Sequence, residues 1–175
     1  MKFTMTAYIV DLKQEWLNDA LHFYDEAMKL KKEKGDLLET LRYLRASIIF
    51  SFASIETTVN QYLLDYIEKN RNDICSCCID KWTEQEGYVR IEEKLTKGVK
   101  HWRRGKPLLT QTKYWVHFKQ LKRTRDDLVH PKHYDKGRYD VEKLAKTAKN
   151  GLNAASGIMK EIKLSYLANL QSKQQ

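Results

Sequence analysis

Proline and glycine are scarce in this chain, with two prolines and seven glycines among 175 residues. Because tight β-turns depend on these residue types, strands connected by hairpins are not expected. Long apolar runs are also missing, since the longest, Ala46–Ile55, contains serines and is too short to span a bilayer. Asp11 interrupts the short apolar stretch at the amino terminus, so we expect no secretory signal. The sequence therefore predicts a soluble, intracellular protein without a membrane partner.

Cysteine is limited to three residues within one turn, Cys75, Cys77 and Cys78. Their number is odd, and no pair of Cys or His stands at zinc-ligand spacing. We therefore expect free thiols in a reducing, cytoplasmic setting, with no metal and no cofactor. The sequence also lacks a glycine-rich phosphate loop, a nucleophile elbow and a carboxylate-rich metal motif, which argues against several common classes of enzyme.

Positive charge is concentrated in one tract. The chain is 42% hydrophobic and 31% charged, as expected for one soluble globular domain, and its formal net charge is +9. Residues 94–138 hold fourteen Lys and Arg against three Asp, so the rest of the chain is slightly acidic. A basic tract of this kind is typical of proteins that bind RNA or DNA. The alternative is that these lysines only solvate the outer faces of helices.

Apolar residues that recur every three or four positions predict five helices and no strand. The helices are expected at 6–33, 36–69, 83–102, 112–129 and 140–168. The second is the longest, and its near-3.5 spacing is typical of left-handed bundle packing. The cysteine stretch is expected to be a loop or a short turn. The prediction is one all-α domain over 1–175, an antiparallel bundle of four to five helices with its core at 6–168 and a frayed tail at 169–175.

The fourth predicted helix carries a charge where its apolar stripe should continue. The stripe consists of Tyr114, Phe118, Leu121 and Leu128. Arg125 stands four residues after Leu121, and a guanidinium that faces a core must meet an anion or a carboxylate. Glu56 borders the buried stripe of the second predicted helix, and Asn60 follows one turn later on the same side. Glu56 could therefore be the partner of Arg125, or the two could form a bridge that only fixes helix register.

His130 follows Arg125 by five residues, at the point where Pro131 should end the helix. On a regular helix the two side chains would not share a face, but unwinding of the last turn would let both converge on one pocket. Asp126 and Asp127 lie four and three residues before His130, within reach of its ring. An inward arginine beside a histidine indicates phosphate handling. The alternative is that His130 only caps the negative end of the helix dipole.

At these residues the sequence resembles the HEPN superfamily, helical domains found in prokaryotic toxins, defence systems and RNA-processing nucleases. Its hallmark is Arg, then a polar residue, then His after four to six intervening residues. Residues 125–130, Arg-Asp-Asp-Leu-Val-His, match with four intervening residues, with Asp126 in place of the commoner Asn. Residues 52–60, Phe-Ala-Ser-Ile-Glu-Thr-Thr-Val-Asn, are similar to the acidic helix that precedes the motif in many members. The resemblance spans roughly residues 37–168.

The resemblance implies a HEPN-like fold and a metal-independent endoribonuclease, usually a homodimer whose two motifs face one cleft. It implies that His130 is a general base or acid, that Arg125 stabilises charge on the phosphorane, and that Asp126 positions one or both. Glu56, Asn60 and Asp127 would support these groups. The RNA backbone would be drawn in by basic residues, for which the candidates are Arg103, Arg104, Lys106, Lys122, Arg123 and Lys132.

Biologically, the resemblance implies a toxin or a defence effector, with a possible antitoxin or nucleotidyltransferase as partner. The His-x-Tyr extension of members that pair with nucleotidyltransferases is missing, because Pro131 and Lys132 follow His130. A second hypothesis is a non-catalytic, dimeric HEPN-like module that binds RNA or a protein. Catalysis predicts Arg125 beside His130 and open to solvent. The inert module predicts Arg125 sealed by Glu56, with His130 pointing away.

Overall fold

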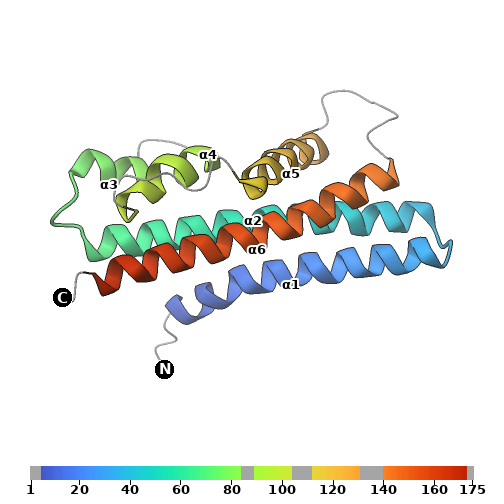
Figure 1. The fold of residues 1–175 in the computed structure, drawn as a ribbon, viewed down its shortest axis with the longest axis horizontal. Coiled ribbons are helices and arrows are strands. Elements are labelled where there is room, and N and C mark those ends of the chain that lie inside the picture. Colours follow the sequence, from blue (N-terminus) through green and yellow to red (C-terminus); the bar gives the residue numbers. More distant parts are fainter. Residues whose placement is uncertain (1–4, 84–88, 104–111, 131–139, 173–175) are drawn as a thin grey trace.

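The computed structural model describes residues 5–83, 89–103, 112–130 and 140–172, and every regular element in these ranges is helical (Figure 1). This confirms the all-α prediction for the described part of the chain. The elements are α1 (Met5–Lys32), α2 (Leu37–Lys69), α3 (Ser76–Trp82), α4 (Ile91–Glu93), the π-helical turn η1 (Lys94–Gly98), the 3-10 turn η2 (Val99–His101), α5 (Lys113–Val129) and α6 (Val141–Gln171).

The long helices α2 and α6 lie side by side, with α1 on one side of the pair and α3, α4 and α5 on the other (Figure 1). Consecutive long helices alternate in direction, as the antiparallel prediction requires. The neighbours α2 and α6 nevertheless run in the same direction (Figure 1). In agreement with this, Tyr166 near the C-terminal end of α6 donates a hydrogen bond to Asp65 near the C-terminal end of α2. The prediction is wrong for this pair. The reason is that α5 returns the chain along the bundle before α6 begins.

The core follows the predicted stripe of α2. Its apolar residues Leu41, Leu44, Ile48, Phe52, Ile55, Val59 and Leu63 are each at most 5% exposed. The helix begins after Asp36, whose carboxylate accepts a hydrogen bond of 2.7 Å from the backbone N–H of Leu38. Burial of this stripe against α1, α5 and α6 makes α2 the helix on which the other long helices assemble.

Three segments differ from the sequence-based expectation. The cysteine stretch forms the short helix α3, which is held by burial of Trp82 and by the hydrogen bond of 3.2 Å from its indole N–H to His101 Nε2. In place of one regular helix at 83–102, the described residues form α4, a π-helical turn and a 3-10 turn. The last helix continues to Gln171, three residues beyond its expected end. Tertiary packing, which local periodicity does not report, decides these boundaries.

No helix in the described ranges is both long enough and apolar enough to cross a lipid bilayer.

Helix α5 packs against α6 with opposite direction, since Tyr114 faces Gly157 and Leu121 faces Gly151. A Cβ atom at position 151 would lie 2.6 Å from Leu121 Cδ1, well inside van der Waals contact. The missing side chain of Gly151 therefore sets how closely α5, which carries the arginine–histidine motif, approaches the core.

Replacing Gly151 by Ala is expected to lower the free energy of unfolding by about 1–3 kcal/mol, because fully buried Leu121 has little room to move. In a Leu121→Ala background the clash disappears. There Gly151→Ala should be neutral or stabilising by up to about 1 kcal/mol, since Ala favours a helix over Gly. Urea unfolding of the four proteins measures both effects. An equal loss in both backgrounds would contradict this account of the packing.

Candidate functional site

Four residues at the C-terminal end of α5 line one cavity of about 970 Å³: Arg125, Asp126, Asp127 and His130. The other walls come from Lys122 of α5, from Phe52 of α2, and from residues before and within α4 and η1: Arg90, Ile91, Glu92, Glu93, Thr96 and Lys97. The structure thus brings Arg125 and His130 to one cavity, although they are five residues apart on the chain. Glu56 and Asn60 are not among the residues that line it.

Arg125 is held at the edge of the core by an aromatic ring. Its guanidinium carbon lies 4.0 Å from the centre of the Phe52 ring, which itself stacks on Phe118 at 6.2 Å with an interplanar angle of 10°. Cations are attracted to the faces of aromatic rings. A charge can therefore occupy the position where the apolar stripe of α5 should continue, and the Arg125 side chain remains 23% exposed.

Two carboxylates compete for this guanidinium, and the closer one is on the same helix. Arg125 Nη1 donates a hydrogen bond of 2.8 Å to Asp126 Oδ1, whereas Arg125 Nη2 lies 3.9 Å from Glu56 Oε2. Glu56 does meet Arg125 across the α2–α5 contact, but at the long limit of an ion pair. Because Arg125 lines the cavity, Glu56 does not seal its side chain from solvent. The guanidinium is nevertheless already paired with Asp126.

Asp126 connects Arg125 to a second cation. Its Oδ2 accepts a hydrogen bond of 2.8 Å from Lys122 Nζ, and the same Nζ lies 3.3 Å from Glu92 Oε1. The hydrogen bond with Asp126 is the largest cause of the raised pKa of Lys122. The network joins α5 to α4 across the cavity. Lys122, a candidate RNA contact from sequence, is therefore already engaged by two carboxylates.

His130 lies where α5 ends. Helix α5 runs to Val129, and the backbone N–H of His130 donates a hydrogen bond of 2.9 Å to the carbonyl of Asp126. The side chain is exposed and lines the cavity. Within the described ranges its ring makes no hydrogen bond or ion pair, so neither Asp126 nor Asp127 orients the imidazole here. The ring is therefore accessible to a molecule in the cavity.

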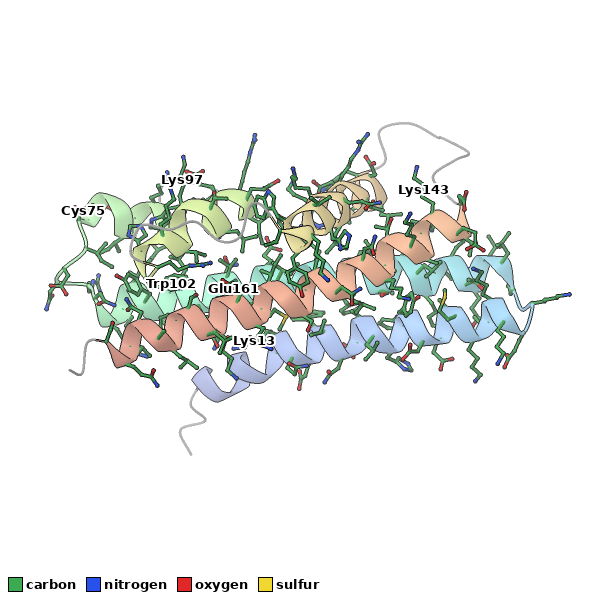
Figure 2. All side chains as sticks on the ribbon, in the orientation of Figure 1. Lys13, Cys75, Lys97, Trp102, Lys143 and Glu161 are labelled. Carbon is green, nitrogen blue, oxygen red and sulfur yellow. The ribbon has the colours of Figure 1, made fainter. Side chains whose placement is uncertain are left out.

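The other residues expected at the site are dispersed. Asn60 accepts a hydrogen bond of 2.9 Å from Lys94 Nζ, a contact on the inner side of η1. Arg103 Nη2 lies 3.0 Å from Oε1 of Glu161, which belongs to α6 and is labelled in Figure 2, so this cation holds the segment after η2 to the bundle. Arg123 is exposed on α5. The remaining RNA-contact candidates, Arg104, Lys106 and Lys132, lie outside the described residues.

Sequence reasoning missed the wall that faces α5. Arg90, Glu92, Glu93 and Lys97 belong to this wall, and they give the cavity equal numbers of basic and acidic side chains, four of each. Glu93 accepts hydrogen bonds from Lys81 at 2.8 Å and from Lys97 at 3.1 Å, and these lower its pKa. The spacing of Glu93 and Lys97 indicates their pairing on one helix face. Nothing in the sequence places that face opposite Arg125.

In the described part of the chain, no three His, Cys, Asp or Glu side chains are grouped in a way that could hold a metal ion.

No family model, no curated protein and no solved structure matches this chain. The chemistry of the cavity is therefore the basis for assigning a function.

Double-mutant cycles should rank the two partners of the guanidinium. We expect Arg125→Met to couple to Asp126→Asn by about 0.5–1 kcal/mol, and to Glu56→Gln by less, because the second contact is 3.9 Å long. Urea unfolding at low ionic strength measures both couplings. A larger coupling to Glu56 would identify the contact between helices as the principal one.

Proposed function

We propose that this protein is a metal-independent endoribonuclease of the HEPN type, which cleaves RNA by transesterification. The observation that carries the proposal is that Arg125 and His130 both line one cavity and are accessible from it. Arginine supplies a permanent positive charge for a phosphate, and histidine exchanges a proton near neutral pH. The resemblance of residues 125–130 to the HEPN motif assigns the same two residues to this chemistry.

In the proposed reaction the ribose 2′-oxygen attacks the adjacent phosphorus while the bond from phosphorus to the 5′-oxygen breaks. Either His130 accepts the 2′-OH proton while water protonates the leaving 5′-oxygen, or His130 protonates that oxygen while water accepts the 2′-OH proton. Arg125 neutralises the charge that develops on the phosphorane oxygens, and Asp126 holds the guanidinium in place through its hydrogen bond of 2.8 Å. The products are a 2′,3′-cyclic phosphate and a 5′-OH, with no net change in protons.

Charge balance sets a condition for this activity. Since the cavity holds as many acidic as basic side chains, an RNA phosphate has to compete with Asp126 and Glu56 for Arg125, and it can use the guanidinium N–H groups that Asp126 does not bind. The 970 Å³ volume leaves space for a nucleotide beside the guanidinium. Exposed Arg123 on α5 and the basic residues outside the described ranges would draw the RNA backbone toward the cavity, with affinity that falls steeply as salt rises.

The resemblance extends the proposal beyond one chain. We propose a homodimer in which two such cavities face one cleft, acting in the cytoplasm as a toxin or a defence effector. A cognate antitoxin or a nucleotidyltransferase would then be its partner. The odd number of cysteines, Cys75, Cys77 and Cys78, supports the proposal of a reducing compartment.

A second function is favoured by the contacts of Arg125. Its guanidinium is engaged by Asp126 and lies near Glu56, so the same residues could serve only to hold α5 on α2. The protein would then be a non-catalytic HEPN-like module that dimerises and binds RNA or a protein. RNA cleavage separates the two functions. Loss of the closest carboxylate tests a narrower point, because it would increase phosphate binding only if Arg125 is available to RNA.

Replacing His130 by Ala, or Arg125 by Gln, should lower the rate of RNA cleavage in EDTA by about 100-fold or more, since each removes a group that acts on the reacting atoms. Gel analysis of labelled RNA measures the rate, and mass spectrometry identifies the cyclic phosphate end. His22→Ala is the matched control, because His22 is exposed on α1, across the bundle from the cavity. It should cleave like the wild type.

Two results would contradict this mechanism. Cleavage that stops in EDTA would show that a metal ion takes part, and undiminished cleavage by the His130→Ala protein would remove its assigned role. If the wild-type protein binds RNA without cutting it, the non-catalytic function is the correct one.

Replacing Asp126 by Asn should strengthen RNA binding several-fold, because it removes the charge that occupies Arg125 and leaves a side chain of the same shape. Fluorescence anisotropy with an RNA that carries a 2′-deoxy position at the cleavage site measures affinity without turnover. Asp127→Asn makes the same change in charge at the neighbouring position. If both variants bind RNA equally more tightly than the wild type, only net charge matters, and Asp126 does not keep Arg125 from the RNA.

A further inference from the structure

Two neighbouring side chains at the end of α3, Lys81 and Trp82, contact the segment that forms the wall of the Arg125 cavity (Figure 1). Lys81 Nζ lies 2.8 Å from Glu93 Oε1, but both side chains are partly exposed, so water weakens this ion pair. Trp82 is only 5% exposed, and its ring lies against Gly98, where an added Cβ atom would be 3.6 Å from Trp82 Cζ3. The buried contact of α3 with this wall is therefore that of Trp82.

The indole of Trp82 depends on His101 for its hydrogen bond. Its N–H donates to His101 Nε2 over 3.2 Å, and the two rings meet edge to face with their centres 6.1 Å apart. An indole nitrogen can only donate, and Nε2 can accept only while it carries no proton. The contact therefore requires a neutral imidazole whose proton is on Nδ1.

The groups around His101 do not favour its charged form. From α2, the Tyr66 hydroxyl donates a hydrogen bond of 3.0 Å to the backbone carbonyl of His101, and burial and the charge of Asp73 raise the pKa of that hydroxyl. From α3, Lys81 Nζ lies 5.2 Å from the centre of the Trp82 ring. Within the described ranges the His101 ring forms no ion pair with a carboxylate. The charged residues that flank it on its own segment are all basic: Lys97, Lys100 and Arg103.

Partial burial of the ring lowers the pKa of His101. The residue nevertheless remains in contact with solvent, so protons reach it without unfolding of the bundle. Because its pKa in the folded protein is lower than in the unfolded chain, the contact with Trp82 contributes its full stability above about pH 6.5. That contribution is lost as the pH falls through the lowered pKa of His101.

We propose that His101 is a pH-sensitive switch that controls the attachment of α3 to the cavity wall. Neutral His101 accepts the hydrogen bond of Trp82 and holds α3 in place. Protonated His101 directs an N–H at the indole N–H, so that two donors oppose each other and a buried donor loses its partner. Release of α3 would also remove Lys81 from Glu93, and it would loosen the wall that faces Arg125. The switch does not depend on the proposed nuclease.

NMR of the ¹⁵N-labelled full chain between about pH 7.5 and pH 5 tests the proposal. The indole N–H signal of Trp82, assigned by its loss in Trp82→Phe, should shift with the same midpoint as the ring protons of His101. Protection factors of the α3 amides, corrected for intrinsic exchange, should fall about tenfold or more, while those of α2 are retained. In His101→Gln both changes should disappear, because the amide oxygen accepts the hydrogen bond and does not titrate. The matched control His22→Gln, at an exposed position on α1, should behave like the wild type.

Three results would overturn the proposal. A Trp82 signal that stays fixed while His101 titrates would show that protonation does not break the contact. A transition that persists in His101→Gln would assign the pH dependence to another group. Equal loss of protection in α2 and α3 would show general acid unfolding and no separate release of α3. Because none of these measurements uses RNA, they can fail while the proposed nuclease stands, and the reverse also holds.

Discussion

The stacking of Arg125 on Phe52 is the contact on which the candidate site depends. Phe52 is only 2% exposed and belongs to the stripe of α2 against which the long helices pack, so the ring that supports the guanidinium is itself fixed by the core. A charged residue at the edge of a core would be costly without such support. The aromatic face lets α5 continue its packing through position 125 while the guanidinium nitrogens remain directed at carboxylates and at the cavity.

In that arrangement the anions near the site compete for the guanidinium of Arg125. Asp126 holds one guanidinium nitrogen at 2.8 Å, Glu56 is 3.9 Å from another, and Lys122 stabilises Asp126 from its far side. In the proposed reaction an RNA phosphate, whose two non-bridging oxygens share one negative charge, has to compete for Arg125 with a carboxylate that Lys122 already neutralises in part. Partial exposure weakens the existing pairs, because water screens them. The network therefore keeps the guanidinium oriented through contacts that water weakens.

Helix periodicity was sufficient to predict the core of this protein, because burial acts on each helix face separately. The stripe of α2 and the end of α5 at Val129 both follow from local spacing and from Pro131. The contact of Glu56 with Arg125 was also foreseeable, since two charges beside core stripes are less costly when they meet. The helical state of α3 and the parallel course of α2 and α6 were not, because they depend on burial of Trp82 and on the return path through α5. For the same reason, the wall that contains Glu92 could not be placed opposite Lys122.

The charge of a tract in the sequence does not give the charge of a site. Residues 94–138 hold a large excess of positive charge, yet several of their cations are already engaged: Lys97 by Glu93, Arg103 by Glu161, and both Lys122 and Arg125 by Asp126. The cavity in this tract is consequently balanced in charge. Attraction of an anion depends on local pairing, which only the packing of the helices determines. The cavity that Arg125 lines therefore attracts an anion less strongly than the net charge of the tract suggests.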